Sequence, residues 1–330
     1  MRPRRTVILP PPARLATLVG LVLLAAATAG ALPTDAIVAR VNGTPILLSE
    51  LKEAALNQDI PIDALTLDGL RGEKYRLVLT QLVDEELLVQ EARQSEIKVD
   101  DVEIARLVDA MINQLRVELG GMEALEAFLR KHSLTLDSLR RMLTRRERRG
   151  ALAARVVARR VNLDAEALAD FARRRREAGL PLEEVNLAQI LLVCPPALRG
   201  TREGEEVHTR ALRLAREIGG DTSRFTELAM QHTEDPAGRS RGGYIGWMDP
   251  QGLLGPLRDA VAAMDPGEVS APVATDEGYH VLLLLGRRST RDLMFAEQFE
   301  KQRAELLTQL RQNASIQLFD LDGNPIETIQ

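Results

Sequence analysis

The most informative part of the chain begins with Asn186-Leu187-Ala188-Gln189-Ile190-Leu191-Leu192-Val193, an apolar run typical of a buried strand. It continues with His232-Thr233-Glu234-Asp235-Pro236 and with the glycine-rich segment Gly242-Gly243-Tyr244-Ile245-Gly246-Trp247. It closes with Gly267-Glu268-Val269-Ser270 and Thr275-Asp276-Glu277-Gly278-Tyr279-His280, and it ends at Arg287. The helix-breaking Gly179-Leu180-Pro181 precedes it, so we assign residues 181–288 to one domain.

The order and spacing of these segments resemble those of the parvulins, which are small peptidyl-prolyl isomerase domains. The resemblance implies an α+β fold in which helices surround a small antiparallel sheet. Together with its flanking regions, the chain is similar to periplasmic folding factors of the SurA kind, some of which carry two parvulin domains in tandem. Only one such segment is found here, so the resemblance is to a short version with a single parvulin domain.

Residues 1–31 have the features of a secretory signal peptide. Four arginines precede an uncharged apolar run from Leu15 to Ala29, and Ala29-Gly30-Ala31 has the small-x-small pattern that signal peptidase accepts. The run is shorter than the about 20 apolar residues that span a bilayer, which favours cleavage over retention as a membrane anchor. We therefore expect a periplasmic product with no stable membrane insertion after signal removal.

Composition argues against several classes of function. Removal of residues 1–31 takes away four arginines and no acidic residue, so the formal net charge changes from −5 to −9 over the remaining 299 residues. A net acidic chain argues against a nucleic-acid-binding protein, which usually has a basic surface. The one cysteine, Cys194, has no disulfide partner, and no Cys or His cluster has zinc-site spacing. We expect no nucleic acid, metal or cofactor.

Residues 32–180 are predicted to form a mainly helical module, which the resemblance identifies as chaperone-like. Near its start, two short apolar runs flank Asn42-Gly43, the pair that favours a tight β-hairpin turn. Apolar residues then recur at helical spacing from Leu77 to Val89, from Val102 to Leu115 and from Leu136 towards Arg160. Asp164 is placed to cap a further helix that ends at Gly179.

Two arginine-rich runs lie in these helical patterns, one at residues 145–149 and one at residues 173–176. Such runs can bind anions or nucleic acid. Their helices are rich in Glu and Asp, and the chain is net acidic. We therefore interpret both runs as solvated helix faces.

Residues 289–330 form the C-terminal segment. A charged amphipathic helix is predicted from about Asp292 to Gln312, followed by an apolar run at residues 315–319 and a hairpin turn at Asp322-Gly323. In proteins of the SurA type the tail returns to the N-terminal module. We therefore expect residues 291–330 to pack on residues 32–165.

The chemistry that the resemblance implies needs no nucleophile, metal or cofactor. Rotation about an Xaa-Pro bond is slow because partial double-bond character must be broken, with a barrier of about 18–20 kcal/mol. An enzyme has to hold the proline ring in an apolar pocket and to stabilise the twisted amide through preorganised polar groups. The expected site is an apolar cup beside a small polar network.

The resemblance supplies the candidate catalytic residues. Asp235 falls where parvulins place an aspartate or a cysteine next to the substrate carbonyl, and Thr275 and His280 match a threonine and a last-strand histidine of the family's hydrogen-bonded core. The family's second histidine is replaced here by Gln189, which keeps donors and an acceptor but cannot titrate. His280 equally fits a purely structural role, because a neutral imidazole can bridge a donor and an acceptor inside a sheet.

The apolar cup of the family is lined by methionine or leucine and, four residues later, by phenylalanine. The matching pair here is Leu253 and Leu257, which at this spacing are expected to share one helix face. Ile245 and Met248 are predicted to add further substrate-binding surface. Loss of the aromatic ring removes stacking area against the proline but leaves an apolar pocket, so it predicts weaker catalysis, as Gln189 does.

Two further features have local explanations. Trp247 fits equally a contact with bound peptide and the filling of a small core. Gly242, Gly243 and Gly246 are expected to serve backbone turns, because the strand-to-helix context of a phosphate site is missing around them.

The leading hypothesis is a periplasmic peptidyl-prolyl cis-trans isomerase and chaperone that acts on unfolded or proline-containing polypeptides, among them outer-membrane protein precursors. Asp235, Thr275 and His280 favour the enzyme. The alternative is a non-catalytic periplasmic chaperone whose parvulin-like domain only binds peptide, which Gln189 and Leu257 favour. A third hypothesis, an assembly partner of one dedicated client, stays open because client choice depends on the surface of the helical module.

Overall fold

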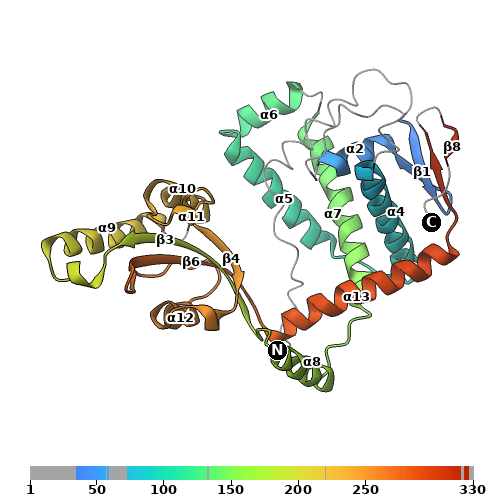
Figure 1. Ribbon diagram of the computed structural model, residues 1–330. Helices are drawn as coiled ribbons and strands as arrows, with labels where there is room; N and C mark the ends of the chain where they lie inside the picture. Colours follow the sequence, from blue (N-terminus) through green and yellow to red (C-terminus); the bar gives the residue numbers. More distant parts are fainter. Residues whose placement is uncertain are drawn as a thin grey trace. The chain divides into compact units, whose positions relative to one another are not determined.

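The computed structural model describes residues 35–56, 58, 73–131, 134–219, 221–320 and 323–326. The predicted signal peptide, residues 1–31, lies outside the described residues. The chain divides into two compact units, drawn as ribbons in Figure 1. Unit 1 contains the described residues up to Val161 and those from Phe299 onwards, and unit 2 contains Asn162–Gln298. Helices and antiparallel sheets occur in both units, so the predicted α+β class is confirmed.

Unit 1 contains an antiparallel sheet of four strands in the order β2-β1-β7-β8. The strands are β1 (Ile37–Val41), β2 (Thr44–Leu47), β7 (Ile316–Phe319) and β8 (Pro325–Ile326). Asn42 and Gly43 join β1 to β2 with φ of 52° and 86°, the left-handed geometry that a two-residue hairpin turn requires. The hairpin predicted from Asn42-Gly43 is therefore confirmed.

The two ends of the described chain meet in this sheet. Val41 of β1 pairs with Ile316 of β7, and Ala39 pairs with Leu318. Asn42 reinforces the junction, because its N–H donates to the carbonyl of Ser315 at 2.8 Å and its Oδ1 accepts from the N–H of Ser315 at 2.8 Å. The N-terminal hairpin thus gains its neighbouring strand from a segment more than 270 residues later in the chain.

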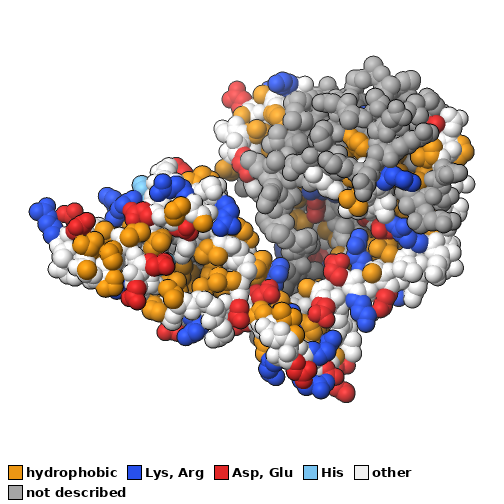
Figure 2. All heavy atoms as spheres, viewed as in Figure 1, with side chains coloured by type: hydrophobic (Ala, Val, Ile, Leu, Met, Phe, Trp, Pro, Cys, Tyr) orange, Lys and Arg blue, Asp and Glu red, His pale blue; other side chains and the backbone are white. Residues whose placement is uncertain are grey.

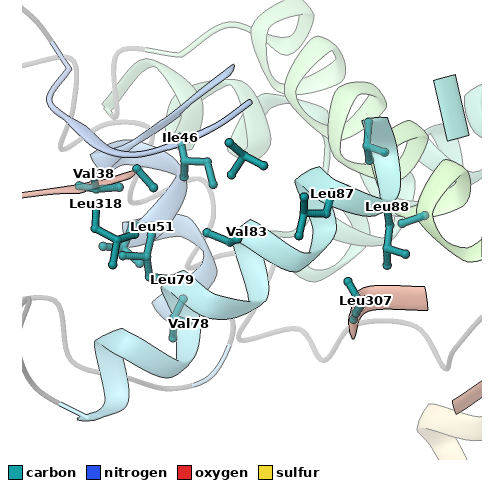
Figure 3. Close-up of a cluster of buried hydrophobic side chains, with 14 of the residues drawn as sticks. Val38, Ile46, Leu51, Val78, Leu79, Val83, Leu87, Leu88, Leu307 and Leu318 are labelled. Atoms are coloured by element: carbon teal, nitrogen blue, oxygen red, sulfur yellow. The ribbon is translucent and has the colours of Figure 1, made fainter. Parts of the chain in front are cut away.

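The helices that the structure describes in unit 1 before residue 161 are α2 (Leu48–Leu56), α4 (Glu73–Gln94), α5 (Asp101–Glu118), α6 (Met122–Lys131) and α7 (Leu136–Ala158). One apolar core joins α2, α4 and α7 to the sheet and to the C-terminal segment. Figure 3 shows Val83 and Leu87 of α4 in this core, together with Leu307 of helix α13 (Thr290–Asn313) and Leu318 of β7. A second cluster joins α5, α6 and α7.

Most of the arginines in the two runs are exposed, as predicted, but one member of each run is held by other residues. Arg149 of α7 pairs with Glu85 at 3.0 Å and with Glu86 at 2.8 Å, and the side chain of Glu86 is only 2% exposed. Arg175 donates through Nε to the carbonyl of Pro181 and lies 5.6 Å from the ring centroid of Phe171. The prediction of solvated faces is therefore wrong for one member of each run, because each is held by partners that are distant in sequence or outside the helix.

Unit 2 contains an antiparallel sheet of four strands in the order β4-β3-β6-β5. The strands are β3 (Glu184–Val193), β4 (Tyr244–Met248), β5 (Val273–Ala274) and β6 (Gly278–Arg288). One face of the sheet packs against α9 (Arg202–Ile218) and α10 (Thr222–His232), and the other packs against α12 (Gly255–Ala262). The two faces have separate apolar cores, so the sheet is the central layer of this unit.

Helix α8 (Ala165–Glu177) also belongs to unit 2, although the sequence grouped it with the N-terminal module. Its Phe171 packs against Leu293 and Met294 at the start of α13. The predicted cap is confirmed, because Oδ1 of Asp164 accepts from the N–H of Ala167 at 2.8 Å. Among all the helices that the structure describes, none has both the length and the apolar character needed to cross a bilayer.

Candidate active site

The centre of the candidate site lies on the two middle strands of unit 2. In the antiparallel register of β3 and β6, Leu191 pairs with His280 and Gln189 pairs with Leu282. Gln189 and His280 are therefore diagonal neighbours on one face of the sheet. Oε1 of Gln189 lies 3.1 Å from Nδ1 of His280, which gives a direct hydrogen bond between the two strands.

This pair is extended at both ends. Oγ1 of Thr275 lies 2.7 Å from Nε2 of His280, and Nε2 of Gln189 lies 3.4 Å from Oδ2 of Asp235. The four candidate catalytic residues from the sequence thus form one continuous chain, Thr275–His280–Gln189–Asp235. Two buried members, Thr275 at 5% and His280 at 2% exposure, lead to the more accessible Asp235.

The hydrogen-bond directions along the chain can be assigned from its carboxylate end. A carboxylate only accepts, so Gln189 turns its amide nitrogen towards Asp235 and its amide oxygen towards His280. That oxygen also only accepts, which assigns the proton of His280 to Nδ1. Nε2 is then free to accept from the hydroxyl of Thr275.

Burial keeps His280 neutral. It lowers the pKa of His280 below its usual range, and the nearby carboxylate of Glu277 opposes this only in part. A neutral imidazole agrees with the assigned hydrogen bonds, in which Nε2 accepts from the hydroxyl of Thr275. The site therefore carries its negative charge on Asp235 with no adjacent histidinium to neutralise it.

Asp235 is fixed in place by its own backbone environment. It precedes the short helix α11 (Pro236–Arg239), and its Oδ1 accepts from the N–H of Ala237 at 3.0 Å. Gly238 makes room for the carboxylate, because a Cβ there would lie 2.7 Å from Oδ2 of Asp235. The orientation of this carboxylate is thus set before any ligand binds.

Gly243 brings the loop after α11 close to β3. Its carbonyl accepts from the N–H of Gln189 at 2.8 Å, and a Cβ on it would lie 2.4 Å from the carbonyl oxygen of Gln189. Its φ of 79° lies in the left-handed region that favours glycine. Gly243 therefore serves a turn, as predicted, and also a close approach to a residue of the network.

Three of the predicted cup residues pack against the apolar core next to α12. Ile245, Met248 and Leu253 are partly buried and pack against a cluster that contains Leu257, Val261 and Met264. Ile245 is an extra residue in β4, because Leu187 pairs with Gly246 while Ala188 pairs with Tyr244. This bulge interrupts the alternation of side chains, so that Ile245 and Met248 both reach the same core.

Leu257 differs from the prediction in two ways. It is only 6% exposed, so it belongs to the packed core under the partly buried side chains. It also does not share a helix face with Leu253, because α12 begins at Gly255, with a proline in its first turn, and Leu253 precedes it in extended conformation. The prediction of one shared helix face is therefore wrong, although both residues contact the same cluster.

Trp247 does not fill the core. Its side chain is 38% exposed, the guanidinium of Arg288 lies 3.8 Å from the centroid of its ring, and the ring touches Gly286. Of the two explanations that the sequence allowed, the core-filling one is wrong.

Several residues that hold the site together were not identified from the sequence. Thr233, fully buried, accepts from the N–H of Leu191 through Oγ1 at 3.1 Å, and Ser270 accepts from the N–H of Leu282 at 2.9 Å. Arg199 donates from Nη2 to the carbonyl of Thr275. Thr233 and Ser270 lie inside the quoted motifs, where their burial could have been suspected, whereas nothing in the sequence around Arg199 indicates its partner. The described residues contain no group of three or more Asp, Glu, His or Cys that could hold a metal ion.

Two family models match parts of the chain. Residues 190–286 match the family described as the PPIC-type PPIase domain, and residues 14–152 match the SurA-like N-terminal domain. The first match contains Asp235, Thr275, His280 and the predicted cup residues, and it begins one residue after Gln189.

Two curated relatives are both named Chaperone SurA. The one from Hahella chejuensis is 27% identical over 265 residues, which cover 77% of this chain and 57% of the relative. The one from Pseudomonas fluorescens is 37% identical over 108 residues, which cover 33% of this chain and 24% of the relative. The chain therefore spans less than two thirds of the length of these relatives.

Among solved structures, the chain is similar to a SurA-like chaperone of Campylobacter jejuni. The two sequences are 19% identical, the match covers 84% of this chain and 96% of the other, and the TM-score is 0.29.

Proposed function

Because residues 190–286 match the PPIC-type PPIase domain and residues 14–152 match the SurA-like N-terminal domain, we propose that the chain catalyses the cis-trans isomerisation of Xaa-Pro bonds in unfolded polypeptides and assists their folding as a chaperone. The observation that carries this proposal is the continuous chain Thr275–His280–Gln189–Asp235, in the same unit as the partly buried apolar side chains of Ile245, Met248 and Leu253. A polar network next to an apolar cup is the combination that this reaction requires.

Asp235 acts on the electron distribution of the amide. In a planar Xaa-Pro bond the carbonyl oxygen carries partial negative charge, which it loses when the bond twists and conjugation breaks. A carboxylate held next to that oxygen destabilises the planar ground state more than the twisted transition state, and this difference lowers the barrier. Neutral His280 and Gln189 orient the carboxylate without cancelling its charge.

The proline ring binds to the side chains of Ile245, Met248 and Leu253. Leu257 belongs to the core against which these side chains pack. Their partly buried side chains offer an apolar surface that needs no rearrangement of the core. The ring is bound in both isomers, so the cup serves as a fixed pivot while the carbonyl of the preceding residue rotates past Asp235.

The proposal is tested by NMR exchange spectroscopy on short Xaa-Pro peptides, because uncatalysed exchange is slow and gives a clean baseline. The chain lacking residues 1–31 should accelerate exchange. Asp235→Asn keeps an oxygen for the N–H of Ala237 but loses both the charge and the acceptor for Nε2 of Gln189, and it should lower the rate about tenfold or more.

Asp249→Asn is the matched control for this experiment. Asp249 caps the short helix at Pro250–Gly252 by accepting from the N–H of Gln251 at 2.8 Å, much as Asp235 caps α11, but it does not contact the network. It should retain the wild-type rate. Equal rates for wild type and Asp235→Asn would exclude the assigned role of Asp235.

A second candidate function is that of a non-catalytic chaperone whose isomerase-like domain only binds peptide. The observations that favour it are Gln189 in place of a titratable histidine and the burial of Leu257 in the core. No acceleration with any peptide, from a folded protein that still suppresses aggregation of an unfolded client, would select this function.

The clients are proposed to be unfolded secreted polypeptides, including outer-membrane protein precursors. Large hydrophobic side chains are exposed on unit 2, among them Leu180, Val193, Met230, Tyr244 and Leu254. Figure 2 shows hydrophobic side chains gathered over the part of unit 2 that contains β3, β4 and β6, with charged side chains between them. Exposed apolar surface of this kind favours contact with unfolded chains.

We place the protein in the periplasm, with residues 1–31 as its cleaved signal peptide, residues 32–180 as the chaperone module, residues 181–288 as the isomerase domain and residues 289–330 as the returning C-terminal segment. Support comes from the arginine-rich start and the apolar run up to Ala29. Intact-mass measurement of the exported protein should show that it begins at Leu32. A mass that still includes residues 1–31 would exclude cleavage.

A further inference from the structure

The turn between β5 and β6 carries the first residue of the polar network. Within this turn, the N–H of Thr275 donates to the carbonyl of Gly278 at 2.8 Å, and the N–H of Gly278 donates back to Thr275 at 3.1 Å. Thr275 has to present its hydroxyl to Nε2 of His280, so the position of this turn decides whether the network is complete.

The loop after β3 holds the turn from outside at two points. The N–H of Cys194 donates to the carbonyl of Glu277 at 3.0 Å. The guanidinium of Arg199 donates from Nη2 to the carbonyl of Thr275. Because a hydrogen bond from a charged donor is stronger than a neutral one, the contact from Arg199 is the stronger of the two.

Arg199 is itself held in place by its surroundings. Its guanidinium lies 5.9 Å from the ring centroid of Tyr279, and that ring stacks on His208 of α9 at 4.8 Å. Its Nε is buried without a hydrogen-bond partner among the described residues. An unpaired buried donor opposes folding, so the guanidinium occupies this place at a cost that its bond to Thr275 has to offset.

The backbone segments around Arg199 and Thr275 are packed tightly against their neighbours. A Cβ on Gly204 would lie 2.2 Å from the carbonyl oxygen of Leu198, and a Cβ on Gly278 would lie 2.1 Å from the carbonyl oxygen of Leu192. The loop is therefore pressed against the first turn of α9, and the turn at residues 275–278 is pressed against β3.

We propose that Arg199 is a positioning residue of the isomerase site. By fixing the carbonyl of Thr275, it directs the hydroxyl of that residue to Nε2 of His280, which keeps the proton of His280 on Nδ1 and the amide oxygen of Gln189 facing it. The amide nitrogen of Gln189 is thereby kept on Asp235. Arg199 thus acts on Asp235 through three intervening side chains and need not touch the substrate.

The first test is the protonation pattern of His280, read from the 15N chemical shifts of its ring in the chain lacking residues 1–31. Wild type should carry its proton on Nδ1. Arg199→Met keeps the apolar stem and loses the donors, and it should give a mixture of the two neutral tautomers. Arg199→Lys keeps a charged donor and should restore the wild-type pattern. This measurement needs no catalysis, so it remains decisive for Arg199 even if the proposed isomerase function fails.

The second test is a double-mutant cycle on kcat/KM, and it rests on the proposed function. Arg199→Met should lower kcat/KM about tenfold. In the background of Thr275→Val, which lacks the hydroxyl, Arg199→Met should have no further effect, because the group through which Arg199 acts is already gone. Additive losses would overturn the proposal, as would an unchanged tautomer in Arg199→Met.

Arg202→Met is the matched control, because the side chain of Arg202 is 93% exposed and pairs only with exposed Glu206 on its own helix. It should match wild type in both tests. Circular dichroism establishes beforehand which variants fold. If Arg199→Met does not fold, Arg199→Gln is used instead. The side chain of glutamine is too short for its amide to reach the carbonyl of Thr275 as the guanidinium of Arg199 does.

Discussion

The imidazole of His280 lies between the amide oxygen of Gln189 and the hydroxyl of Thr275, and it is almost fully buried. Burial lowers its pKa below the usual value of about 6.5, whereas in the unfolded chain it regains that value. Below about pH 6.5 the unfolded chain therefore binds a proton that the folded chain does not. The stability contributed by neutral His280 is complete above this pH and is lost as the pH falls through it.

We accordingly predict a difference between wild type and His280→Gln in how the free energy of unfolding depends on pH. Between about pH 7.5 and pH 4.5, wild type should lose more stability than the variant, by about 1.4 kcal/mol for each unit by which the pKa is lowered. Urea unfolding followed by circular dichroism measures this difference. Carboxylates titrate in both proteins and cancel in the comparison, so parallel curves would show that His280 is not held neutral by burial.

Leu257→Phe is expected to destabilise the protein. The family carries a ring at this position, but Leu257 is 6% exposed and packed against Val261 and Met264. Added volume in a packed core costs about 1–3 kcal/mol, so the variant should lower the free energy of unfolding by that amount with no gain in isomerase rate. Leu253→Phe is the comparison, because Leu253 is only partly buried and its ring would face the cup. A faster Leu257→Phe enzyme of unchanged stability would contradict this.

At the scale of residues, the sequence predicted the four residues of the polar network better than it predicted the residues that hold them in place. Asp235, Gln189, Thr275 and His280 were identifiable because each sits in a short motif, and the structure brings all four together. Arg199 could not be found in this way, because its partner Thr275 is 76 residues away and no local pattern links them. Arg149 was misplaced for a related reason, because its partners Glu85 and Glu86 are more than 60 residues away, whereas Arg175 is held by Pro181 just beyond the end of its own helix.

The elements around the site depend on glycines whose backbone no other residue adopts easily. We predict that Gly243→Ala abolishes the site. Its φ of 79° is strained for alanine, and the new Cβ would lie 2.4 Å from the carbonyl oxygen of Gln189 and 3.1 Å from Cβ of Ala229. The strand β3 would have to move, with an expected loss of about 3 kcal/mol or more in stability. Isomerase activity should disappear with it.

Gly252→Ala is the matched control for Gly243→Ala. Nothing lies within 4 Å of a Cβ at Gly252, and no left-handed φ is found there. Thermal unfolding of the two variants should therefore differ clearly, with Gly252→Ala within about 0.5 kcal/mol of wild type. Similar melting of both would mean that the approach of Gly243 to Gln189 is not required.

Elements with local signals were the ones that the sequence predicted correctly. The hairpin at Asn42-Gly43 and the cap at Asp164 are each set by a few adjacent residues. The bulge at Ile245 was not predicted, because an extra residue in β4 is defined only by its register against β3. The start of α12 at Gly255 follows from Pro256, and the i, i+4 argument for Leu253 and Leu257 overlooked that signal.

At the scale of the whole chain, the C-terminal segment belongs to unit 1 only from Phe299 onwards, whereas the start of α13 belongs to unit 2, so the expectation that all of residues 291–330 pack on the N-terminal module is wrong for residues 291–298. Leu306, Leu307 and Leu318 are buried in the core that also contains Val38 and Leu87. Arg311 of α13 pairs with Asp84 of α4 at 2.7 Å. We predict that truncation after Arg288 leaves residues 35–161 without a stable fold, because it removes β7 and these core side chains together.

Hydrogen exchange tests this prediction. The amides of β1 and α4 should lose their protection from exchange in the truncated chain. Truncation after Ile326 is the control, since it retains β7, β8 and α13 and should leave protection unchanged. Leu318→Ala is the milder version and should cost about 2–5 kcal/mol. Protection that survives truncation after Arg288 would show that residues 35–161 fold without the tail.

The pairing of Val41 with Ile316 also means that the sheet of unit 1 can be completed only late in synthesis of the chain. At about 5–20 residues per second, the ribosome needs roughly 14–55 s to make the chain between these two residues. Unit 2 is encoded as an uninterrupted insert and has all its strands before the tail emerges. The hairpin of β1 and β2, in contrast, keeps an unpaired edge on β1 for nearly the whole of synthesis. A protein proposed to assist unfinished chains is therefore itself incomplete for most of its synthesis, because β1 gains its second neighbour only when β7 has been made.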